Sequence, residues 1–264
     1  MKTRLALRAL ALSYLGFLIL LPVASVFWIT FSDGVGRFWA SITTPEALSA
    51  FYLTLIAAVI AVAANTVFGV LCAIVLVRHR FPGKRLLSAL IDLPLAVSPV
   101  VVGLALILVY GSAGWFGAPL AERGIMIIFS VPGIILATIF VSLPFVVREV
   151  VPVLRETGTE QEQAASTLGA SSWQTFWRVT LPSIKPGVAY GVVLTTARAL
   201  GEFGAVSVVS GRIIGRTQTL TLHVEDRFQA FDLTGAYAAS VVLAVLAVGT
   251  LLAMNFLNRE EKPR

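Results

Sequence analysis

The chain has 264 residues, of which 57% are apolar and only 13% are charged, whereas an ordinary soluble domain has about 25% charged residues. Together with a mean hydropathy of +0.88, this composition excludes an ordinary soluble globular enzyme. The formal net charge is +6 and the sequence pI is about 9.9, so the distribution of the basic residues has to be explained as well.

Six apolar runs are each long enough to cross a membrane. A helix needs about 20 residues to span a hydrocarbon core roughly 30 Å thick. We therefore predict an all-α integral membrane protein with one transmembrane domain over residues 1–264. Its six transmembrane helices are predicted at about residues 9–31, 51–77, 86–110, 125–147, 186–211 and 233–257.

The first run follows three basic residues and so also resembles a secretory signal peptide. The apolar stretch of a signal peptide has about 7 to 15 residues and ends in a small-residue cleavage site. Here the apolar stretch continues through Phe27, Trp28 and Phe31, so we expect a helix that is retained.

Basic residues indicate the orientation, because short cytoplasmic loops collect Lys and Arg. If the N-terminus is cytoplasmic, fourteen of the 20 basic residues fall on that side and Arg198 lies within a helix. The outer side then holds only Arg37, Arg123, Arg212, Arg216 and Arg227. We therefore expect both termini in the cytoplasm of a multi-pass protein of the cell membrane. The positive net charge needs no nucleic acid as a partner.

The third run contains a feature that has two interpretations. Asp92 lies close enough to the predicted start of the helix to reach the interface, and Pro94 and Pro99 free backbone carbonyl groups and predict a kink. The kink is either a structural bend or part of a gate.

The sequence offers no catalytic or metal-binding cluster. Cys72 is the only cysteine and lies in the second run, where we expect it to pack as a small apolar residue. His79 and His223 have no second ligand at metal-binding spacing, and we expect both on the surface. A phosphate-binding glycine loop is missing from the sequence, so ATP hydrolysis has to come from another polypeptide.

The segment between the fourth and fifth runs, residues 148–185, is the longest connection and the place where we expect a partner. Thr159 to Glu162 matches a capping box, which predicts a short helix over about residues 160–168, ended by Gly169. Ser171 to Gln174 matches a second capping box, and we expect Pro182 to end the helix that it opens. The segment is therefore predicted to be a helical hairpin.

One face of this hairpin is apolar, since Trp173, Phe176 and Trp177 recur at helical spacing. Such a hairpin has too little core to be stable alone. The aromatic residues either pack against the membrane helices of the same chain or bind another protein. The small residues on the first helix favour close docking of a partner.

The hairpin resembles the "EAA" loop of the permeases of ABC importers. The positions that carry this resemblance are Gln163-Ala164-Ala165, Gly169 and Val179-Thr180-Leu181-Pro182. The family usually has Glu where this chain has Gln163. Glu162 could replace that charge but points about 100° away around the helix. The resemblance implies a coupling helix that fits a groove of a separate ATPase and transmits its closure, with Glu162, Gln163, Ala164, Ala165, Gly169, Leu181 and Pro182 as the coupling residues.

Two ionisable residues, Arg198 and Glu202, lie four residues apart in the fifth run and therefore share one helix face. Either Arg198 attracts an anionic substrate while Glu202 balances its charge, or the two form a structural ion pair within the membrane. Gly201 and Gly204 allow a kink next to this pair. Ser207 and Ser210 either line a path for an anion or form hydrogen bonds between helices.

The run from Ala197 to Gly211 resembles the fifth helix of sulfate, thiosulfate and molybdate importer permeases, most of all the sulfate/thiosulfate permeases of the CysW type. This resemblance implies the type I ABC-importer permease fold and a non-catalytic subunit without a cofactor of its own. It also implies three kinds of partner: a homologous second permease in a heterodimer, two ATP-binding subunits that hold ATP and Mg, and an extracytoplasmic sulfate/thiosulfate-binding protein. Membrane lipid surrounds the chain.

Three other functions are weighed against this one. A molybdate/tungstate importer shares the Arg198 to Gly204 core, so that core does not select the anion. An ion-gradient-driven secondary transporter should show inverted repeats, and an intramembrane enzyme should carry a catalytic pair or metal ligands in its helices. Neither of the last two explains the hairpin from Gln163 to Pro182.

Overall fold

The computed structural model describes residues 2–260, with side chains described for residues 7, 8, 10 and 12–252. Within this range the chain is helical and contains no strand, which confirms the all-α class. Lys262 and Arg264, two of the basic residues assigned to the cytoplasmic side, lie outside the described residues.

The helices follow one another with short connections. In chain order they are α1 (Lys2–Leu15), the π-helix η1 (Gly16–Leu20), α2 (Leu21–Ser32), α3 (Val35–Ile42), α4 (Pro45–Arg78), α5 (Lys84–Ala96), α6 (Pro99–Tyr110), α7 (Gly117–Ala121), α8 (Val131–Thr157), α9 (Glu160–Thr167), α10 (Ser172–Thr175), the π-helix η2 (Phe176–Thr180), α11 (Leu181–Leu200), α12 (Gly204–Val209), α13 (Leu220–Gln229) and α14 (Leu233–Glu260).

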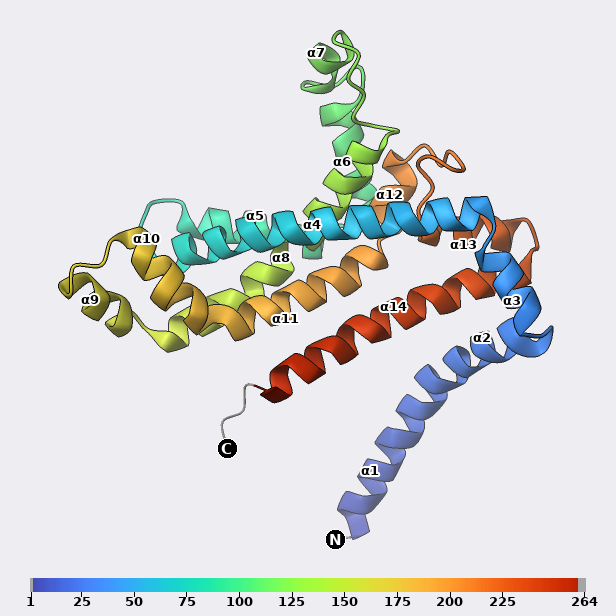
Figure 1. Cartoon of the computed structure of the whole chain (residues 1–264), viewed down its shortest axis with the longest axis horizontal. Helices are drawn as coiled ribbons and strands as arrows, with labels where there is room; N and C mark the ends of the chain where they lie inside the picture. The colour runs from blue at the N-terminus through green and yellow to red at the C-terminus, as the bar shows by residue number, and fades with distance from the viewer. Residues whose placement is uncertain (1, 261–264) are drawn as a thin grey trace.

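The long helices α4, α8, α11 and α14 form the body of the molecule, with α9 and α10 at one end and α3 and α13 at the other (Figure 1). Helix α8 packs against both α4 and α11. The largest apolar core lies where these three helices meet and includes Val70, Val146, Leu154 and Ile184. This core fixes the end of the bundle that carries α9 and α10.

Two glycines let the three helices approach closely. A side chain at Gly69 of α4 would come within 2.7 Å of Val146 Cβ, and one at Gly191 of α11 would come within 2.8 Å of Val146 Cα. Small residues at helix crossings allow backbones to pack directly, which is how membrane helices gain most of their association energy. Both glycines therefore bring their helices against the same residue of α8.

A buried polar contact joins α4 to α8 deeper in the bundle. Asn65 is fully buried, and its Nδ2 donates hydrogen bonds to the Ile139 carbonyl at 3.1 Å and to Ser142 Oγ at 2.9 Å. Hydrogen bonds of this kind fix the register of two membrane helices. The hydropathy pattern did not reveal this contact.

Fewer uninterrupted spans are present than the six expected. Among the residues that the structure describes, four helical stretches are long and apolar enough to cross a membrane: Leu12–Ser32, Pro45–Arg78, Val131–Thr157 and Leu233–Leu252. The pair α5 and α6 makes a fifth if it is one span. The helix expected over residues 186–211 corresponds to α11 and α12, which are separated by Gly201 to Phe203. Polar residues within α11 lower its hydropathy.

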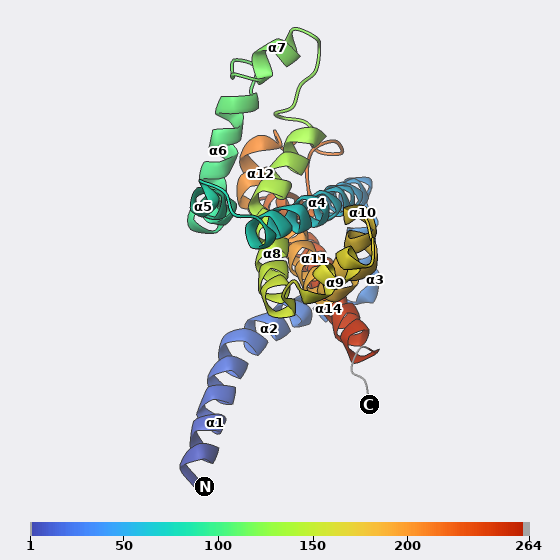
Figure 2. The ribbon, with the colours of Figure 1, turned by 90° about the vertical axis from the view of Figure 1, so that its left-hand side faces the viewer.

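The helix expected over residues 86–110 is broken in two. Helices α5 and α6 meet at 115°, a sharper bend than a proline kink. Val97 is extended, and Ser98, with ψ at 133°, also lies outside the helical region. The ring of Pro99 disfavours a helical conformation for Ser98, the residue directly before it. The bend makes α6 and α7 project from the body of the molecule (Figures 1 and 2).

The predicted limits of the hairpin segment also need correction. Helix α8 continues ten residues beyond the predicted end and stops at Gly158, because Pro144 and Pro152 are accommodated inside it, as prolines often are in membrane helices.

The first helix runs over α1, η1 and α2 as one continuous element. Its apolar stretch is not buried in the chain, and α1 leaves the bundle in both views (Figures 1 and 2).

Candidate coupling hairpin and intramembrane ion pair

The hairpin at residues 159–181 has the predicted helix, turn and helix. Helix α9 matches the predicted range within one residue. Gly169 follows it with a φ of +86°, a left-handed conformation that glycine adopts without strain. The second capping box is confirmed, since Ser171 Oγ accepts from the Gln174 backbone at 3.3 Å and Gln174 Oε1 accepts from the Ser171 backbone at 2.9 Å.

The first capping box is not formed. Thr159 makes no side-chain cap, and its hydroxyl instead accepts a hydrogen bond from Gln163 Nε2 at 3.0 Å. Glu162, the expected partner, turns away because it pairs with a guanidinium group outside the hairpin. A charged partner outweighs a neutral backbone donor in a site that is mostly shielded from water.

Glu162 connects the hairpin to the ends of three helices. Its carboxylate lies 2.9 Å from Arg78 Nε and accepts a hydrogen bond from the Thr180 hydroxyl at 2.9 Å. The Arg78 guanidinium also donates to the carbonyls of Leu154 at 3.0 Å and Gly158 at 2.6 Å. We call Arg78, Glu162 and Thr180 the hairpin clamp. The clamp ties α9 to α4, α8 and η2.

The outer face of the hairpin carries exposed apolar groups. Leu168 is 88% exposed, Trp173 is 69% exposed and Trp177 is 50% exposed, whereas Phe176 is half-buried against the core below. Packing within the chain therefore accounts for Phe176, and the two tryptophans are left available to a partner. Gln163, Ala164 and Gly169 are exposed on the same hairpin and Ala165 is half-buried.

Pro182 does not end the second helix, contrary to expectation. The π-helix η2 connects α10 to α11 without a break, and the Leu181 backbone N–H bonds to the Phe176 carbonyl five residues before it. The wider π turn shifts the hydrogen-bond register just ahead of the proline, which has no N–H to donate. Leu181 and Pro182 therefore lie inside a helix that leads from the hairpin into the bundle.

The predicted contact between Arg198 and Glu202 is present. Arg198 Nη1 lies 2.6 Å from Glu202 Oε2. Glu202 is 3% exposed, and its other oxygen accepts a hydrogen bond from the Ala205 backbone at 2.8 Å, at the start of α12. The Thr221 hydroxyl donates to the Glu202 carbonyl at 2.8 Å. The carboxylate thus balances Arg198 and also stabilises the N-terminus of α12.

The two serines beyond the pair use their hydroxyls locally. Ser207 Oγ donates to the Gly204 carbonyl at 2.8 Å, and the buried Ser210 Oγ accepts from the Arg212 backbone at 3.1 Å. Neither of these hydrogen bonds joins two long helices. A role of either serine in a path for an anion stays a prediction.

The expectation for His223 was wrong. Its side chain is buried at 3% exposure, because Thr219 to Leu222 begin α13 and fold against α4 and α14. His223 Nδ1 lies 3.4 Å from Gln218 Oε1. Burial lowers the pKa of His223 below 6.5, and the positive charge of Arg227 lowers it further. His79 is exposed as expected.

The fold and the hairpin can now be compared with known proteins. Residues 65–262 match the family described as "Binding-protein-dependent transport system inner membrane component". The chain belongs to this family. As a member, it is an inner membrane component of binding-protein-dependent transport, which agrees with the expected location in the cell membrane.

Relatives in this permease family resemble the chain over nearly its full length. It is 52% identical to "Sulfate transport system permease protein CysW" of Synechocystis sp., over 98% of this chain and 94% of that protein. It is 48% identical to the protein of the same name from Escherichia coli K12, over 92% of this chain and 83% of that protein. It is 40% identical to "Sulfate transport system permease protein CysT" of E. coli K12, over 94% of this chain and 88% of that protein.

Solved structures support the same fold. The chain superposes with a TM-score of 0.80 on a bacterial ABC transporter involved in the import of the acidic polysaccharide alginate, over 99% of this chain and 98% of that one. A second structure also superposes with a TM-score of 0.80. It is the bacterial alginate transporter in complex with an alginate-pentasaccharide-bound periplasmic protein. Sequence identities of 18% and 20% make this evidence for the permease fold alone.

Sequence reasoning missed the partners of Glu162 in this permease. Arg78 closes the second apolar run and Thr180 stands within the "EAA" resemblance, but nothing in the spacing places them together. A basic residue at the end of a long helix was the available signal, because such a residue commonly bonds to nearby carbonyl groups.

Proposed function

We propose that this chain is a membrane-spanning permease subunit of an ATP-driven importer of sulfate or thiosulfate. The observation that carries the proposal is the 52% identity to a CysW-named sulfate transport permease over nearly the whole chain. The subunit is non-catalytic and binds no cofactor of its own. ATP and Mg belong to a separate ATPase.

The proposed topology has six crossings with both termini in the cytoplasm. The bent pair α5 and α6 forms the third crossing, and α11 with α12 forms the fifth. The asymmetry of Lys and Arg supports this orientation. It places the hairpin of α9 and α10 on the cytoplasmic side, where an ATPase can reach it.

The proposed assembly is a heterodimer of two homologous permeases, with two ATP-binding subunits and an extracytoplasmic binding protein that delivers the anion. Similarity to both CysW-named and CysT-named relatives supports a second permease of related sequence. The alginate transporter bound to its periplasmic protein supports a binding protein as partner. The first span, with Trp28 79% exposed, offers an apolar surface to the second permease.

The proposed coupling works through the hairpin clamp. Leu168, Trp173 and Trp177 contact the ATPase, and Glu162 passes any displacement of α9 to α4 and α8 through Arg78. Because α10, η2 and α11 form one continuous helix, the same displacement reaches Arg198 and Glu202. Such a lever connects two arrangements of the ATPase pair to two arrangements of the permease pair.

The proposed role of Arg198 and Glu202 is to hold the break between α11 and α12 in place. An oppositely charged partner at 2.6 Å removes the need for a ligand to neutralise Arg198. Loss of either charge should then impair assembly more than anion selectivity.

The test is ATP hydrolysis by the reconstituted complex of this chain, its second permease and the ATPase. Binding protein loaded with sulfate or thiosulfate should stimulate hydrolysis. Molybdate is the competing cargo, since the run around Arg198 also resembles molybdate permeases. Stimulation by molybdate alone would show that the complex is an importer whose cargo is molybdate and not sulfate. Failure of the ATPase to associate would refute the proposal that the chain belongs to an ATP-driven importer.

A further inference from the structure

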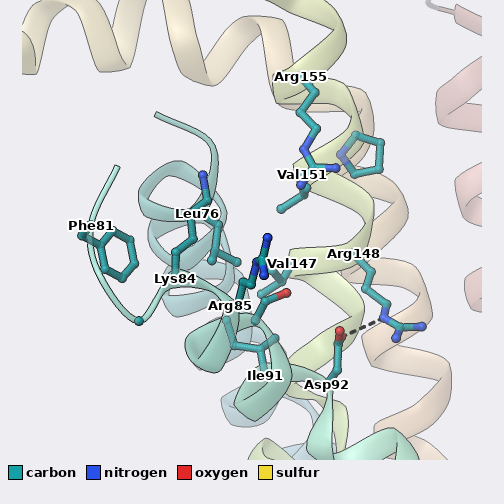
Figure 3. Close-up of a pocket in the computed structure, with 13 residues that line it drawn as sticks. Leu76, Phe81, Lys84, Arg85, Ile91, Asp92, Val147, Arg148, Val151 and Arg155 are labelled. Carbon is teal, nitrogen blue, oxygen red and sulfur yellow. Dashed lines mark hydrogen bonds and ion pairs between the residues drawn. The ribbon is translucent and has the colours of Figure 1, made fainter. Parts of the chain in front are cut away.

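A cavity of about 710 Å³ lies at the hairpin end of the bundle, between the end of α4, the start of α5 and the second half of α8. Figure 3 shows the side chains that line it. Neither α9 nor the exposed tryptophans of the hairpin contribute to its walls. The cavity is therefore separate from the surface proposed to bind the ATPase.

The charges that line this cavity are mainly positive. Lys84, Arg85, Arg148 and Arg155 contribute four cations, and Asp92 contributes one anion. Asp92 is already paired, with its Oδ1 3.0 Å from Arg148 Nε, and this contact is the dashed line in Figure 3. Within the described residues, neither Arg85 nor Arg155 has an acidic partner in an ion pair. The lining therefore carries an excess of positive charge.

The start of α5 adds to this excess. Helix α5 begins at Lys84, and its N-cap residue, Gly83, has no side chain to accept from the first backbone N–H groups. The N-terminus of a 13-residue helix carries a partial positive charge that favours an anion. Gly83, Lys84 and Arg85 all line the cavity.

Apolar side chains lie among the charged ones in the lining (Figure 3). Leu76 and Ile91 are buried parts of the main core, and Val147 lies beside them. Val151 and Phe81 are only half-buried, so they supply the apolar surface of the cavity that is still accessible. An inorganic anion would leave the apolar surface in contact with water. A ligand with an anionic group next to hydrocarbon would use both kinds of side chain.

We propose that this cavity binds the phosphate group of an anionic phospholipid headgroup. The phosphate lies among Arg85, Arg155 and the start of α5, and the hydrocarbon next to it covers Phe81 and Val151. Basic pockets between membrane helices on one side of the bilayer hold anionic headgroups in this way. The cavity lies at the end of the helices, at headgroup depth for a chain that spans the membrane.

The experiment measures lipid binding to the full chain by native mass spectrometry in a mild neutral detergent. Phosphatidylglycerol and phosphatidylcholine with identical acyl chains are the two probes. The chain should retain phosphatidylglycerol preferentially. The double variant Arg85→Gln/Arg155→Gln should weaken that binding roughly 30-fold, which corresponds to about 1 kcal/mol for each basic residue near an anionic headgroup.

The matched control is Arg80→Gln/Arg178→Gln, which removes two exposed arginines from the same end of the molecule without touching the cavity lining. It should leave the preference for phosphatidylglycerol nearly unchanged. Arg85→Lys/Arg155→Lys keeps the charge and should retain most of the binding, which distinguishes lost recognition from a failure to fold.

Three results would overturn the proposal. Equal retention of both lipids would show that the charges do not select a headgroup. An equal loss of phosphatidylglycerol binding in the cavity variant and in the control variant would show that the binding depends on overall charge and not on this cavity. Retention of inorganic sulfate or phosphate in place of phosphatidylglycerol would assign the cavity to a free anion. None of these outcomes depends on transport activity.

Discussion

At Glu162, one carboxylate contacts side chains from two other elements, Arg78 of α4 and Thr180 of η2. The side chain of Arg78 is only 12% exposed and that of Glu162 is 21% exposed. Charges that are this well shielded depend on their partner, since removing one leaves the other poorly solvated. Glu162 therefore helps to fix the position of α9 in the hairpin.

Substitution of this residue gives the first prediction. Glu162→Gln should lower the free energy of unfolding by about 1–3 kcal/mol, the usual cost of leaving a shielded polar group without its partner. Thermal unfolding of the purified chain measures the change. Glu160→Gln is the control, because Glu160 is an exposed acid on the same helix. Equal effects of the two substitutions would mean that the clamp contributes nothing beyond surface charge.

His223 gives a prediction about pH. Burial lowers its pKa below the value of 6.5 expected for the unfolded chain, so the unfolded state binds more protons in the window just below pH 6.5. Stability should therefore rise with pH through that window and become level above it. His223→Asn, which can still donate to Gln218, should remove this slope.

Unfolding midpoints recorded from about pH 5 to about pH 8 would measure this slope. The control is His79→Asn, which removes an exposed histidine. An unchanged slope in His223→Asn would assign the pH dependence to other groups.

The sequence alone revealed some of these residue contacts and not others. The pair of Arg198 and Glu202 could be predicted because its members are four residues apart in the sequence, although Glu202 lies just beyond the end of α11. The pair of Arg78 and Glu162 could not, because 84 residues separate its members and only the packing of α4 against α8 brings them together. His223 was misjudged because a polar residue on a short amphipathic helix carries no sign of which face is covered.

At the scale of the elements, hydropathy located the helices but not all of their ends. Apolar runs report which residues avoid water, whereas the ends depend on local backbone chemistry. Proline shows the difficulty most clearly, because Pro144 and Pro182 are accommodated within helices whereas Pro99 follows a break of 115°. Whether a proline ends a helix depends on which carbonyl groups find other partners.

Close helix packing gives a prediction at this scale. Gly69→Ala and Gly191→Ala should each lower the free energy of unfolding by about 1–3 kcal/mol, because the new methyl group overlaps Val146. Gly249→Ala in α14 has open space around it and should raise stability by about 0.5–1 kcal/mol. Chemical or thermal unfolding in detergent distinguishes the two directions, and a gain at all three positions would contradict the crossing geometry.

The exposed face of the hairpin gives a second prediction at this scale. Trp173→Ala/Trp177→Ala should weaken association with the ATPase by roughly 30-fold, as expected for aromatic residues at the centre of an interface, while unfolding of the isolated chain changes little. Trp115→Ala is the control, because Trp115 is 85% exposed and lies outside the hairpin. A loss of stability without a loss of association would show that the tryptophans pack within the chain.

At the scale of the whole molecule, the helical hairpin and its continuous connection to α11 are what a coupling element requires. The general fold could be predicted from hydropathy and the spacing of the "EAA" resemblance. Pro94 and Pro99 predicted a kink in the third run, but not that the bend between α5 and α6 reaches 115°. The exposed first helix could not be predicted, since its environment depends on contacts beyond the chain. The anion follows from similarity to sulfate permeases and not from any single contact.

The most direct test of the account is uptake of labelled sulfate into proteoliposomes that contain the complete complex. ATP is enclosed in the lumen, which the ATPase subunits face, and the loaded binding protein is added outside. The parent complex should accumulate sulfate. Gly169→Val, which strains the left-handed turn of the hairpin, should abolish uptake. Gly124→Val, which alters a comparable left-handed glycine in open space away from the hairpin, should preserve it. Sulfate uptake that survives Gly169→Val, or that never depends on this chain, would contradict the account.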